Sequence, residues 1–490
     1  MEEMCFKDDV EIIYFLEELR NENIFVWEEN GSLKYRSEKK KLPKEVLQKL
    51  KNSKAQMIKF FQNAKRSRFL LTPIQSAYYI GQQTGCELGA TNAHYYIEYE
   101  VNQLDVQKLE DAVNQVILAN DALRMVIDHD GTAYTFNHVK AYKIPVYKYD
   151  GMDTRLAVRE EWSRKQYPIG SWPMFHFHAG KSDTGKDLLH VDFDCIILDA
   201  WSAKLMLTQV FDIYNGKGKK VLGITFSQYM REQKPEINEK AKEYWNSMTK
   251  EMPNAPKLPY KKKFLDVKEI EFARIEHSFT VEQTKKLYER TKKLFYTPAA
   301  VVCTTFLYAL SEFSEESAVA VNLTLFNRQP LHKDINMVLG EFTNTAVAKC
   351  GSDRTVSFME EVKNVQKQFW KMVEFRNYDG TEILKKLARG QLGKAVMPIV
   401  FTCMLAGEQP IQDSGFKEQY AISQTPQVVL DHHVRDDLGY LTISWDYVKE
   451  LLGEKEVNQI FTRYVELLTQ VIECSDWSTI RRKDRNDVGL

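Results

Sequence analysis

The sequence predicts a mixed α/β (α+β) protein with a small N-terminal unit and a much larger body. From about residue 68, β-prone and helical stretches alternate almost to the C-terminus, a pattern that favours sheets packed against helices. Hydrophobic residues make up 43% of the 490 residues and aromatic ones 12%, which is enough for a sizeable core and excludes a disordered chain. Glycine (22) and proline (14) are sparse, so no low-complexity linker is expected.

Composition also excludes several classes of protein and site. The 67 basic and 68 acidic side chains leave a net charge of −1, without the basic excess typical of a nucleic-acid binder. No apolar run approaches the roughly 18 residues of a membrane span, and no signal peptide is visible. We therefore expect a cytoplasmic protein without membrane contact. The seven cysteines are scattered and never spaced as Cys-x-x-Cys, so neither a disulfide framework nor a metal site is predicted.

Charge is unevenly distributed within the first 65 residues. Residues 1–31 carry 10 acidic and 2 basic side chains, whereas residues 32–65 carry 2 acidic and 11 basic ones. The balances of −8 and +9 nearly cancel and leave −2 for the rest of the chain. Such asymmetry indicates a small unit with a polarised surface, suited to a charged contact with another protein.

The elements of this small unit follow from its pattern. Apolar residues at helical spacing predict a helix over 10–19, and the β-prone run 24–27 predicts a short strand. Asn30-Gly31 is a strong signal for a tight hairpin turn, because both turn residues need positive φ; residues 32–36 then form the return strand. Two helical stretches follow over 42–61. The predicted order is αββαα.

Four stretches show how the body alternates. Residues 95–101 and 188–194 have the alternation of strands, whereas 106–119 and 202–214 have the spacing of amphipathic helices. A body of about 410 residues built in this way is large enough for two lobes.

Five residues that could take part in binding or catalysis lie in, or just after, apolar strands of the body. Asp194 and Asp199 stand five residues apart between a strand and a helix, and a buried carboxylate needs a partner to stay ionised. Arg328 follows a long apolar strand, where an unpaired buried guanidinium would be costly. Thr402 is the one hydroxyl in its strand, and Asp431 ends another. Pattern alone also allows a helix cap for Asp199 and plain packing for Thr402.

Four short motifs cover most of residues 8–63 and identify the small unit. They are Leu16-x-x-Leu19-Arg20, Val26-Trp27, Gly31-x-Leu33-x-Tyr35-Arg36 and Leu47-x-x-Leu50-x-x-x-Lys54. With them the unit resembles the β-hairpin docking domains of nonribosomal peptide synthetase subunits, of the tubulysin-synthetase type. The resemblance implies that the hairpin edge captures a short, often acidic, C-terminal peptide of an upstream subunit. The residues implied are Trp27, Lys34, Tyr35 and Arg36; a solvated basic face is the alternative.

A second set of motifs runs in order from Leu70 to about Leu468. They are Leu71-Thr72-Pro73-Ile74-Gln75-x-Ala77-Tyr78-x-x-Gly81, Leu123-Arg124, Asp194 to Ser202, Thr297-Pro298, Asn322 to Arg328, Gly340-x-Phe342-Thr343, Tyr378-x-Gly380, Phe401-Thr402, Gln424-Thr425-Pro426-Gln427-x-x-Leu430-Asp431 and Trp445-Asp446. In this order and spacing they resemble the heterocyclization domains of nonribosomal peptide synthetases, a branch of the condensation domains. Departures occur at Ala119-Asn120, at Leu258-Pro259 and at Glu341, where the family has Arg-His, a proline-rich segment and an aspartate.

The form Asp194-x-x-x-x-Asp199 separates two branches of that family. Ordinary condensation domains carry His-His-x-x-x-Asp-Gly at this place, whereas the heterocyclization branch carries Asp-x-x-x-x-Asp, often followed by x-x-Ser, here Ser202. The later run His432-His433-x-x-x-Asp437 imitates the first signature. It lacks the glycine and lies where the family has its Leu-Asp strand end, so we do not expect a condensation-type site there.

The resemblance implies both a fold and a reaction. The fold is two chloramphenicol-acetyltransferase-like lobes in a V, with the site in a tunnel between them. Residues 1–65 would be the docking domain, 66–255 the N-terminal lobe, 256–478 the C-terminal lobe and 479–490 a tail or linker. The reaction joins an upstream acyl or peptidyl thioester to the amine of a Cys, Ser or Thr thioester. Loss of water then closes a thiazoline or oxazoline ring.

The resemblance also implies roles for site residues. Asp431 would move protons during cyclisation, and Thr402 would hydrogen-bond the hemiaminal oxygen or orient Asp431. We expect Asp199 to pair with Arg328 and hold the tunnel walls. The organising residues are Asp194, Asp199, Ser202 and Arg328, and the tunnel lining includes Gln427, Trp445 and Tyr78.

Partners follow from the same resemblance. No cofactor is expected on this chain, because both substrates ride on phosphopantetheine arms that partner carrier domains supply. The partners are an upstream subunit, acting through its C-terminal docking peptide, the donor and acceptor carrier domains, and a downstream adenylation domain as a further candidate. The alternatives are a condensation-only domain, a catalytically silent carrier-docking module and a freestanding acyltransferase. The choice of Cys over Ser or Thr stays open.

Overall fold

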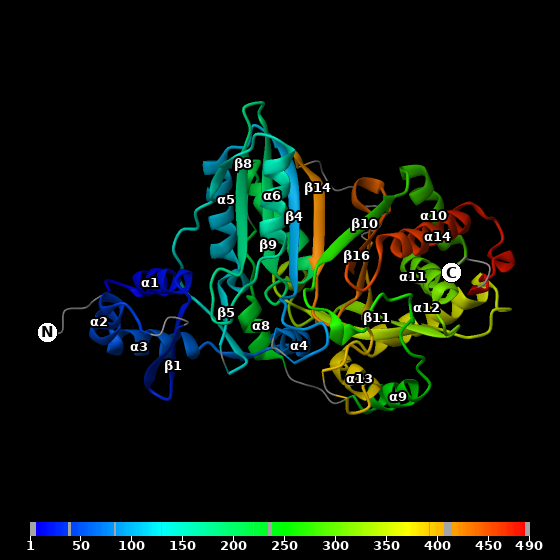
Figure 1. Cartoon of the computed structure of the whole chain (residues 1–490), viewed down its shortest axis with the longest axis horizontal. Helices are drawn as coiled ribbons and strands as arrows, with labels where there is room; N and C mark the ends of the chain where they lie inside the picture. Colours follow the sequence, from blue (N-terminus) through cyan, green and yellow to red (C-terminus); the bar gives the residue numbers. More distant parts are fainter. Residues whose placement is uncertain are drawn as a thin grey trace.

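The computed structural model describes residues 6–37, 41–82, 85–128, 130–218, 220–233, 238–391, 393–405 and 414–485. Three parts follow one another along the long axis of the molecule (Figure 1): a small N-terminal unit, a first lobe and a second lobe. Helices and sheets occur in all three parts, so the mixed α/β class is confirmed.

The N-terminal unit has the predicted αββαα order. β1 and β2 pair antiparallel, and Asn30 (φ 49°) and Gly31 (φ 74°) form the tight turn with the positive φ that the Asn-Gly pair indicated. Asp8 caps the first helix by accepting a hydrogen bond from the Glu11 N–H. The elements are α1 (Asp9–Asn21), β1 (Ile24–Glu29), β2 (Ser32–Ser37), α2 (Lys44–Asn52) and α3 (Lys54–Lys65).

The first lobe is built on a five-stranded sheet of order β14-β4-β9-β8-β7 and a three-stranded sheet of order β3-β6-β5. In chain order the elements from residue 69 to 250 are β3 (Phe69–Leu70), α4 (Pro73–Gly81), β4 (His94–Asn102), α5 (Val106–Ala119), η1 (Asp121–Arg124), β5 (Met125–Ile127), β6 (Thr132–Thr135), β7 (Val146–Lys148), α6 (Met152–Ser163), β8 (Phe175–Lys181), β9 (Lys186–Asp194), α7 (Ala200–Tyr214), α8 (Phe226–Glu232) and α9 (Glu239–Lys250). The last of them, α9, packs with the second lobe, whose core contains Trp245 (Figure 1).

The second lobe is built on a six-stranded mixed sheet of order β10-β16-β15-β13-β11-β12. Its central helix α11 is buried on all sides from Ala300 to Phe313, which is why its sequence is apolar without a polar face. In chain order the remaining elements are η2 (Phe264–Asp266), β10 (Phe272–Ser278), α10 (Val281–Lys293), α11 (Pro298–Phe313), β11 (Val319–Phe326), η3 (Ile335–Met337), β12 (Thr343–Cys350), α12 (Phe358–Glu374), α13 (Gly380–Leu387), β13 (Ile399–Met404), β15 (Leu430–Arg435), η4 (Asp437–Gly439), β16 (Thr442–Val448), α14 (Glu454–Glu473) and η5 (Trp477–Thr479). The segment that holds η3 packs on the first lobe, where Ile335 and Val338 join the core.

One strand crosses the division expected at residues 255 and 256. β14 (Phe416–Gln424) belongs to the C-terminal half of the chain but pairs antiparallel with β4 in the first lobe's sheet, with Ser423 opposite Tyr95. Figure 1 shows the orange β14 beside the cyan β4. A division by residue number therefore does not separate the two sheets, because the C-terminal half of the chain contributes a strand whose ladder hydrogen bonds are made with the first lobe's sheet.

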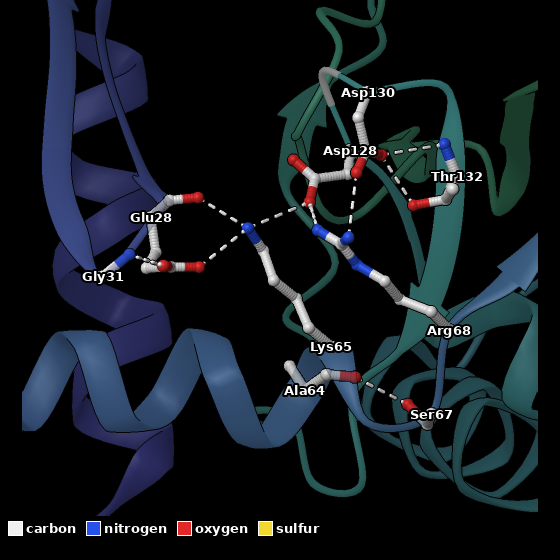
Figure 2. A network of polar contacts seen from close by, with 9 residues as sticks. All are labelled: Glu28, Gly31, Ala64, Lys65, Ser67, Arg68, Asp128, Asp130 and Thr132. Atoms are coloured by element: carbon white, nitrogen blue, oxygen red, sulfur yellow. Dashed lines mark hydrogen bonds and ion pairs between the residues drawn. The ribbon is translucent and has the colours of Figure 1, made fainter.

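A chain of charged side chains joins the N-terminal unit to the first lobe (Figure 2). Lys65 Nζ lies 3.0 Å from Glu28 Oε2 on the hairpin and 3.4 Å from Asp128 Oδ2 on the lobe. Arg68 pairs with both Asp128 and Asp130. Burial alone would raise the pKa of Glu28, but its hydrogen bonds with Lys65 and the Gly31 N–H hold that pKa below its ordinary value.

We expect Lys65→Ala to lower the free energy of unfolding by about 2 kcal/mol, because it leaves two largely buried carboxylates without their shared cation. Urea unfolding of the whole chain measures the loss. Lys59→Ala removes an exposed lysine from the same helix and is the matched control. Equal stability of the two variants would show that the charged junction contributes nothing.

A buried histidine, His190, and a half-buried one, His178, lie on the face of the first lobe's sheet that α6 covers. His190 contacts the hydroxyls of Tyr96 (2.5 Å) and Tyr147 (2.6 Å), and His178 packs 3.5 Å from the Trp162 ring. Burial lowers the pKa of both imidazoles to about 4. Both rings are therefore neutral in the folded protein at neutral pH.

Because the pKa values of these two histidines are lowered on folding, we expect the protein to lose stability in mild acid. Their pKa is about 4 in the folded chain and about 6.5 in the unfolded chain. The unfolded state thus binds more protons between these values, and stability falls as the pH drops from about 6.5 to 4. His178→Phe keeps a flat ring and should flatten this pH dependence, whereas His138→Phe, at an exposed position, should not. Thermal unfolding across the pH range tests both.

Candidate functional site

A cavity of about 1750 Å³ lies between the two lobes. Its walls come from α4, β4 and α7 of the first lobe, from β14, and from β11, β13, β15 and β16 of the second. Five residues that the sequence singled out line this one space: Tyr78, Asp199, Thr402, Gln427 and Asp431. They come from segments more than 300 residues apart and meet only in the folded chain.

Thr402 and Asp431 sit on adjacent parallel strands. In the register of β13 and β15, Thr402 lies opposite His433 and Asp431 lies opposite Val400, so both side chains reach the same cavity. The Thr402 hydroxyl is 2.9 Å from the Thr324 hydroxyl. Within the described part of the chain it makes no hydrogen bond to Asp431, so direct orientation of Asp431 by Thr402 is not seen.

Asp431 is buried, with 6% of its surface exposed. Its Oδ2 atom accepts a hydrogen bond from the Ser423 hydroxyl (3.1 Å) and lies 3.3 Å from His433 Nε2. Its Oδ1 atom is buried and has no hydrogen-bond partner among the described residues. One oxygen is thus anchored, and the other keeps its capacity to accept a proton.

A second buried aspartate stands behind Asp431. Asp446 accepts two hydrogen bonds from Arg274, at 2.8 and 2.6 Å, and one from the Ser423 N–H at 2.9 Å. Its Oδ2 atom also lies 2.9 Å from the Ser423 hydroxyl and competes with Asp431 for the one proton of that hydroxyl. Burial would lower the pKa of Arg274, but the Asp446 carboxylate raises it above its ordinary value. This pair holds Ser423 against Asp431. Arg274 and Ser423 were not singled out from the sequence, because no local pattern shows that β10 pairs with β16. Nor does it show that β14, which pairs with β4, brings Ser423 next to Asp431 and Asp446.

Trp445 does not line the cavity, and the expectation that it does is wrong. The side chain is fully buried and packs against Phe306, Phe461 and Tyr464, with ring centroids 5.0 to 5.8 Å away. Successive residues of a strand point to opposite faces. Trp445 therefore faces the core of the second lobe, and its neighbour Asp446 faces the site. The strand pattern marked this pair of residues, but not which of the two faces inward.

The expected pairing of Asp199 with Arg328 is present and links the lobes. Asp199 caps α7 by accepting from the Ser202 N–H at 2.6 Å, and its Oδ2 lies 2.8 Å from Arg328 NH1. Arg328 also donates to the Ser202 hydroxyl at 2.7 Å and stacks on the Phe342 ring at 4.1 Å. The side chains of Asp199 and Arg328 are 0% and 6% exposed. Ser202 and Arg328 themselves lie behind the cavity wall.

Asp194 also lies behind the wall rather than in it. It ends β9 and accepts hydrogen bonds from Asn92 Nδ2 (2.5 Å) and the Ile196 N–H (2.9 Å). Complete burial raises its pKa to about 6. These contacts shape the turn between β9 and α7, and through it the position of Asp199.

Glu341 is a cavity residue that the sequence marked only as a departure. It is 1% exposed and accepts a 2.5 Å hydrogen bond from the Thr343 N–H. Burial, and then the charge of Asp199, raise its pKa well above the ordinary value. Burial and the nearby Glu341 similarly raise the pKa of Tyr78. Both shifts favour the uncharged forms of the Glu341 carboxyl group and the Tyr78 phenol.

The four predicted docking residues share the hairpin. Trp27 and Lys34 lie opposite each other in the register of β1 and β2. Lys34 and Arg36 are exposed, and Tyr35 is 53% exposed. The Arg36 guanidinium lies 5.2 Å from the Phe25 ring centroid. Binding of a peptide by these residues stays a prediction.

The described residues hold neither a metal-binding cluster nor a single membrane-spanning helix. In the described ranges, no three His, Cys, Asp or Glu side chains lie close enough together to hold a metal ion. None of the described helices is by itself long and apolar enough to cross a membrane; α10 and α11 meet that test only together, bent by 106°.

We expect loss of the interlobe ion pair to cost about 3–5 kcal/mol of unfolding free energy. Asp199→Asn keeps a good helix cap but removes the charge. Arg328→Met should be equally costly, and the double variant little worse than either single one, because each leaves the other residue unpaired. Asp105→Asn changes the exposed cap of α5 and is the control. Urea unfolding measures all four, and an Asp199→Asn loss no larger than the control's would contradict the expectation.

Comparison with known proteins places both parts of the chain. The family model described as "Condensation domain" matches residues 65–478, and the one described as "TubC N-terminal docking domain" matches residues 12–63. A crystal structure of the EpoB NRPS cyclization-docking bidomain from Sorangium cellulosum superposes with a TM-score of 0.77 at 24% identity, over 96% of this chain and 100% of that one. The nonribosomal peptide synthetase FmoA3 superposes with a TM-score of 0.72 at 23% identity, over 84% and 43%.

Three curated relatives illustrate that similar proteins can be much longer than this chain. Bacitracin synthase 1 from Bacillus licheniformis is 26% identical over 85% of this chain and 8% of its own length. Pyochelin synthetase PchF from Pseudomonas aeruginosa is 26% identical over 94% and 27%, and phenyloxazoline synthase MbtB from Mycobacterium tuberculosis is 25% identical over 83% and 30%. The chain thus spans less than a third of each of these relatives. From these matches, the chain belongs to the condensation-domain family of nonribosomal peptide synthetases and carries a TubC-type docking domain at its N-terminal end.

Proposed function

We propose that this chain condenses a carrier-bound acyl or peptidyl thioester with carrier-bound Cys, Ser or Thr and then closes a thiazoline or oxazoline ring. Three observations support the proposal. The Asp194-x-x-x-x-Asp199 form stands where condensation-only domains carry two histidines. Among similar proteins are a phenyloxazoline synthase and a cyclization-docking bidomain. The observation that carries most weight is the buried Asp431 carboxylate at the cavity, with one oxygen anchored and the other unpartnered.

Amide formation asks mainly for proximity. The acceptor amine attacks the donor thioester carbonyl, the C–S bond breaks, and the released thiol takes up the proton that the amine loses. Holding both thioesters in one cavity turns this into an effectively intramolecular step. A space of about 1750 Å³ is large enough for the reacting ends of two substrates.

Ring closure needs proton transfer at the new amide. The side-chain thiol or hydroxyl of the acceptor adds to the amide carbonyl and gives a hemiaminal. Loss of the amide nitrogen's proton and of the hemiaminal hydroxyl as water then leaves a C=N bond. Asp431 Oδ1 would accept the nitrogen's proton and deliver it to the leaving hydroxyl. Thr402, which lines the same space, would donate a hydrogen bond to that hydroxyl oxygen.

The docking domain would receive the upstream subunit. Lys34 and Arg36 are exposed on β2, and the 32–65 segment carries a balance of +9. Strand addition along the hairpin would supply backbone hydrogen bonds, and these cations would favour an acidic peptide. The carrier domains would bring the phosphopantetheine-bound substrates to the cavity.

Replacement of Asp431 should separate the two reactions. With a donor carrier and an acceptor carrier loaded in turn with Cys, Ser and Thr, we expect Asp431→Ala to form the linear amide and to lose ring closure by about 100-fold or more. Mass spectrometry distinguishes the products, because the cyclised product is lighter than the linear amide by one water molecule. Asp431→Asn should behave as Asp431→Ala does, and Asp153→Ala, at an exposed site on α6, as the parent.

Two results would contradict the proposal. A parent chain that gives only linear amide with all three acceptors would be a condensation-only domain. An Asp431→Ala variant that closes rings at the parent rate would leave the proposal without its catalytic group.

A further inference from the structure

His433 stands beside the carboxylate to which the proposed function assigns proton transfer. Asp431 and His433 are two residues apart on β15, so their side chains share a face. His433 Nε2 lies 3.3 Å from Asp431 Oδ2 and 3.1 Å from the Ser423 hydroxyl. The His433 side chain is 13% exposed and lines the cavity.

Strand alternation separates the two histidines of the pair. His432 is fully buried on the other face, with Nε2 2.8 Å from the Tyr464 hydroxyl and its ring stacked on Phe401. It belongs to the core of the second lobe. Of the two histidines, only His433 faces the site. The His432-His433 motif therefore does not form a two-histidine active site.

Ser423 cannot anchor Asp431 without help. Its hydroxyl has one proton and lies within reach of two carboxylates, Asp431 Oδ2 at 3.1 Å and Asp446 Oδ2 at 2.9 Å. Whenever that proton goes to Asp446, Asp431 Oδ2 needs another donor. His433 Nε2 lies within reach of that oxygen at 3.3 Å, as well as of the Ser423 hydroxyl at 3.1 Å and of Asp446 Oδ2 at 3.6 Å, and it can donate when it carries a hydrogen.

We infer that His433 is a positioning residue for ring closure, an inference that rests on the proposed function. It donates from Nε2 to Asp431 Oδ2 and fixes the rotation of the carboxylate. The Oδ1 atom is then left for the amide nitrogen's proton. Amide formation depends on proximity of the thioesters and does not need this hydrogen bond. His433 therefore acts through Asp431, on the second of the two reactions.

Two substitutions separate this role from packing. His433→Leu keeps most of the volume but has no donor, whereas His433→Gln keeps an N–H donor near the position of Nε2. Single-turnover reactions with a Cys-loaded acceptor carrier would report the rates of amide formation and ring closure separately. Thermal unfolding would report stability, and His138→Leu, at an exposed site, controls for loss of a histidine.

We expect His433→Leu to slow ring closure by about 10-fold, with amide formation and stability close to the parent's. His433→Gln should restore ring closure to within about threefold of the parent. In the Asp431→Asn background, His433→Leu should have no further effect on ring closure, because its partner has already lost its function.

Three results would overturn the inference. Ring closure at the parent rate in His433→Leu would show that the hydrogen bond is not needed. Equal slowing of both steps with lower stability, and no rescue by His433→Gln, would show a structural role. A parent that closes no ring would fail the proposed function itself, and this inference with it; the first two results leave the proposed function intact.

Discussion

The buried ion pair between Asp199 and Arg328 is the constraint on which the cavity depends. Asp199 is the first residue of the turn into α7 in one lobe, and Arg328 follows β11 in the other. Both charges are out of water, and each satisfies the other together with Ser202 and the Phe342 backbone. Because an uncompensated buried charge is costly, the lobes stay in the one relative position that keeps the pair together. That position determines the walls of the cavity.

The reacting groups lie where the two sheets meet. Asp431 and Asp446 stand on β15 and β16 of the second lobe, whereas Ser423 stands on β14, which belongs to the first lobe's sheet. The hydrogen bonds around Asp431 thus cross from one sheet to the other. Preorganisation of the carboxylate is in this way a consequence of how the lobes join, rather than of any single strand.

Much of the order and type of the secondary-structure elements could be predicted from the sequence, because they depend on residues close together in the chain. The Asn30-Gly31 turn needs positive φ whatever surrounds it, and the αββαα order follows from periodicity. The pairing of Asp199 with Arg328 was also predictable, because a lone buried charge demands a partner. Trp445 shows the limit: the strand pattern marked Trp445-Asp446 together, and the face that each one takes was decided by tertiary packing, with α11 and α14 covering the side of the sheet that Trp445 faces.

The sequence by itself determined which elements form, which family they belong to, and that Thr402 and Asp431 lie on apolar strands, although Asp431 is the second residue of β15 rather than its end. Only the tertiary structure decided the surroundings of Asp431. The reason is that β10, β14, β15 and β16 come together across more than 150 residues, and no local pattern records such pairing. That assembly places Arg274, Ser423 and His433 in the site. The strand β14 pairs with β4 because the edge of the first lobe's sheet offers backbone groups that a further strand can hydrogen-bond.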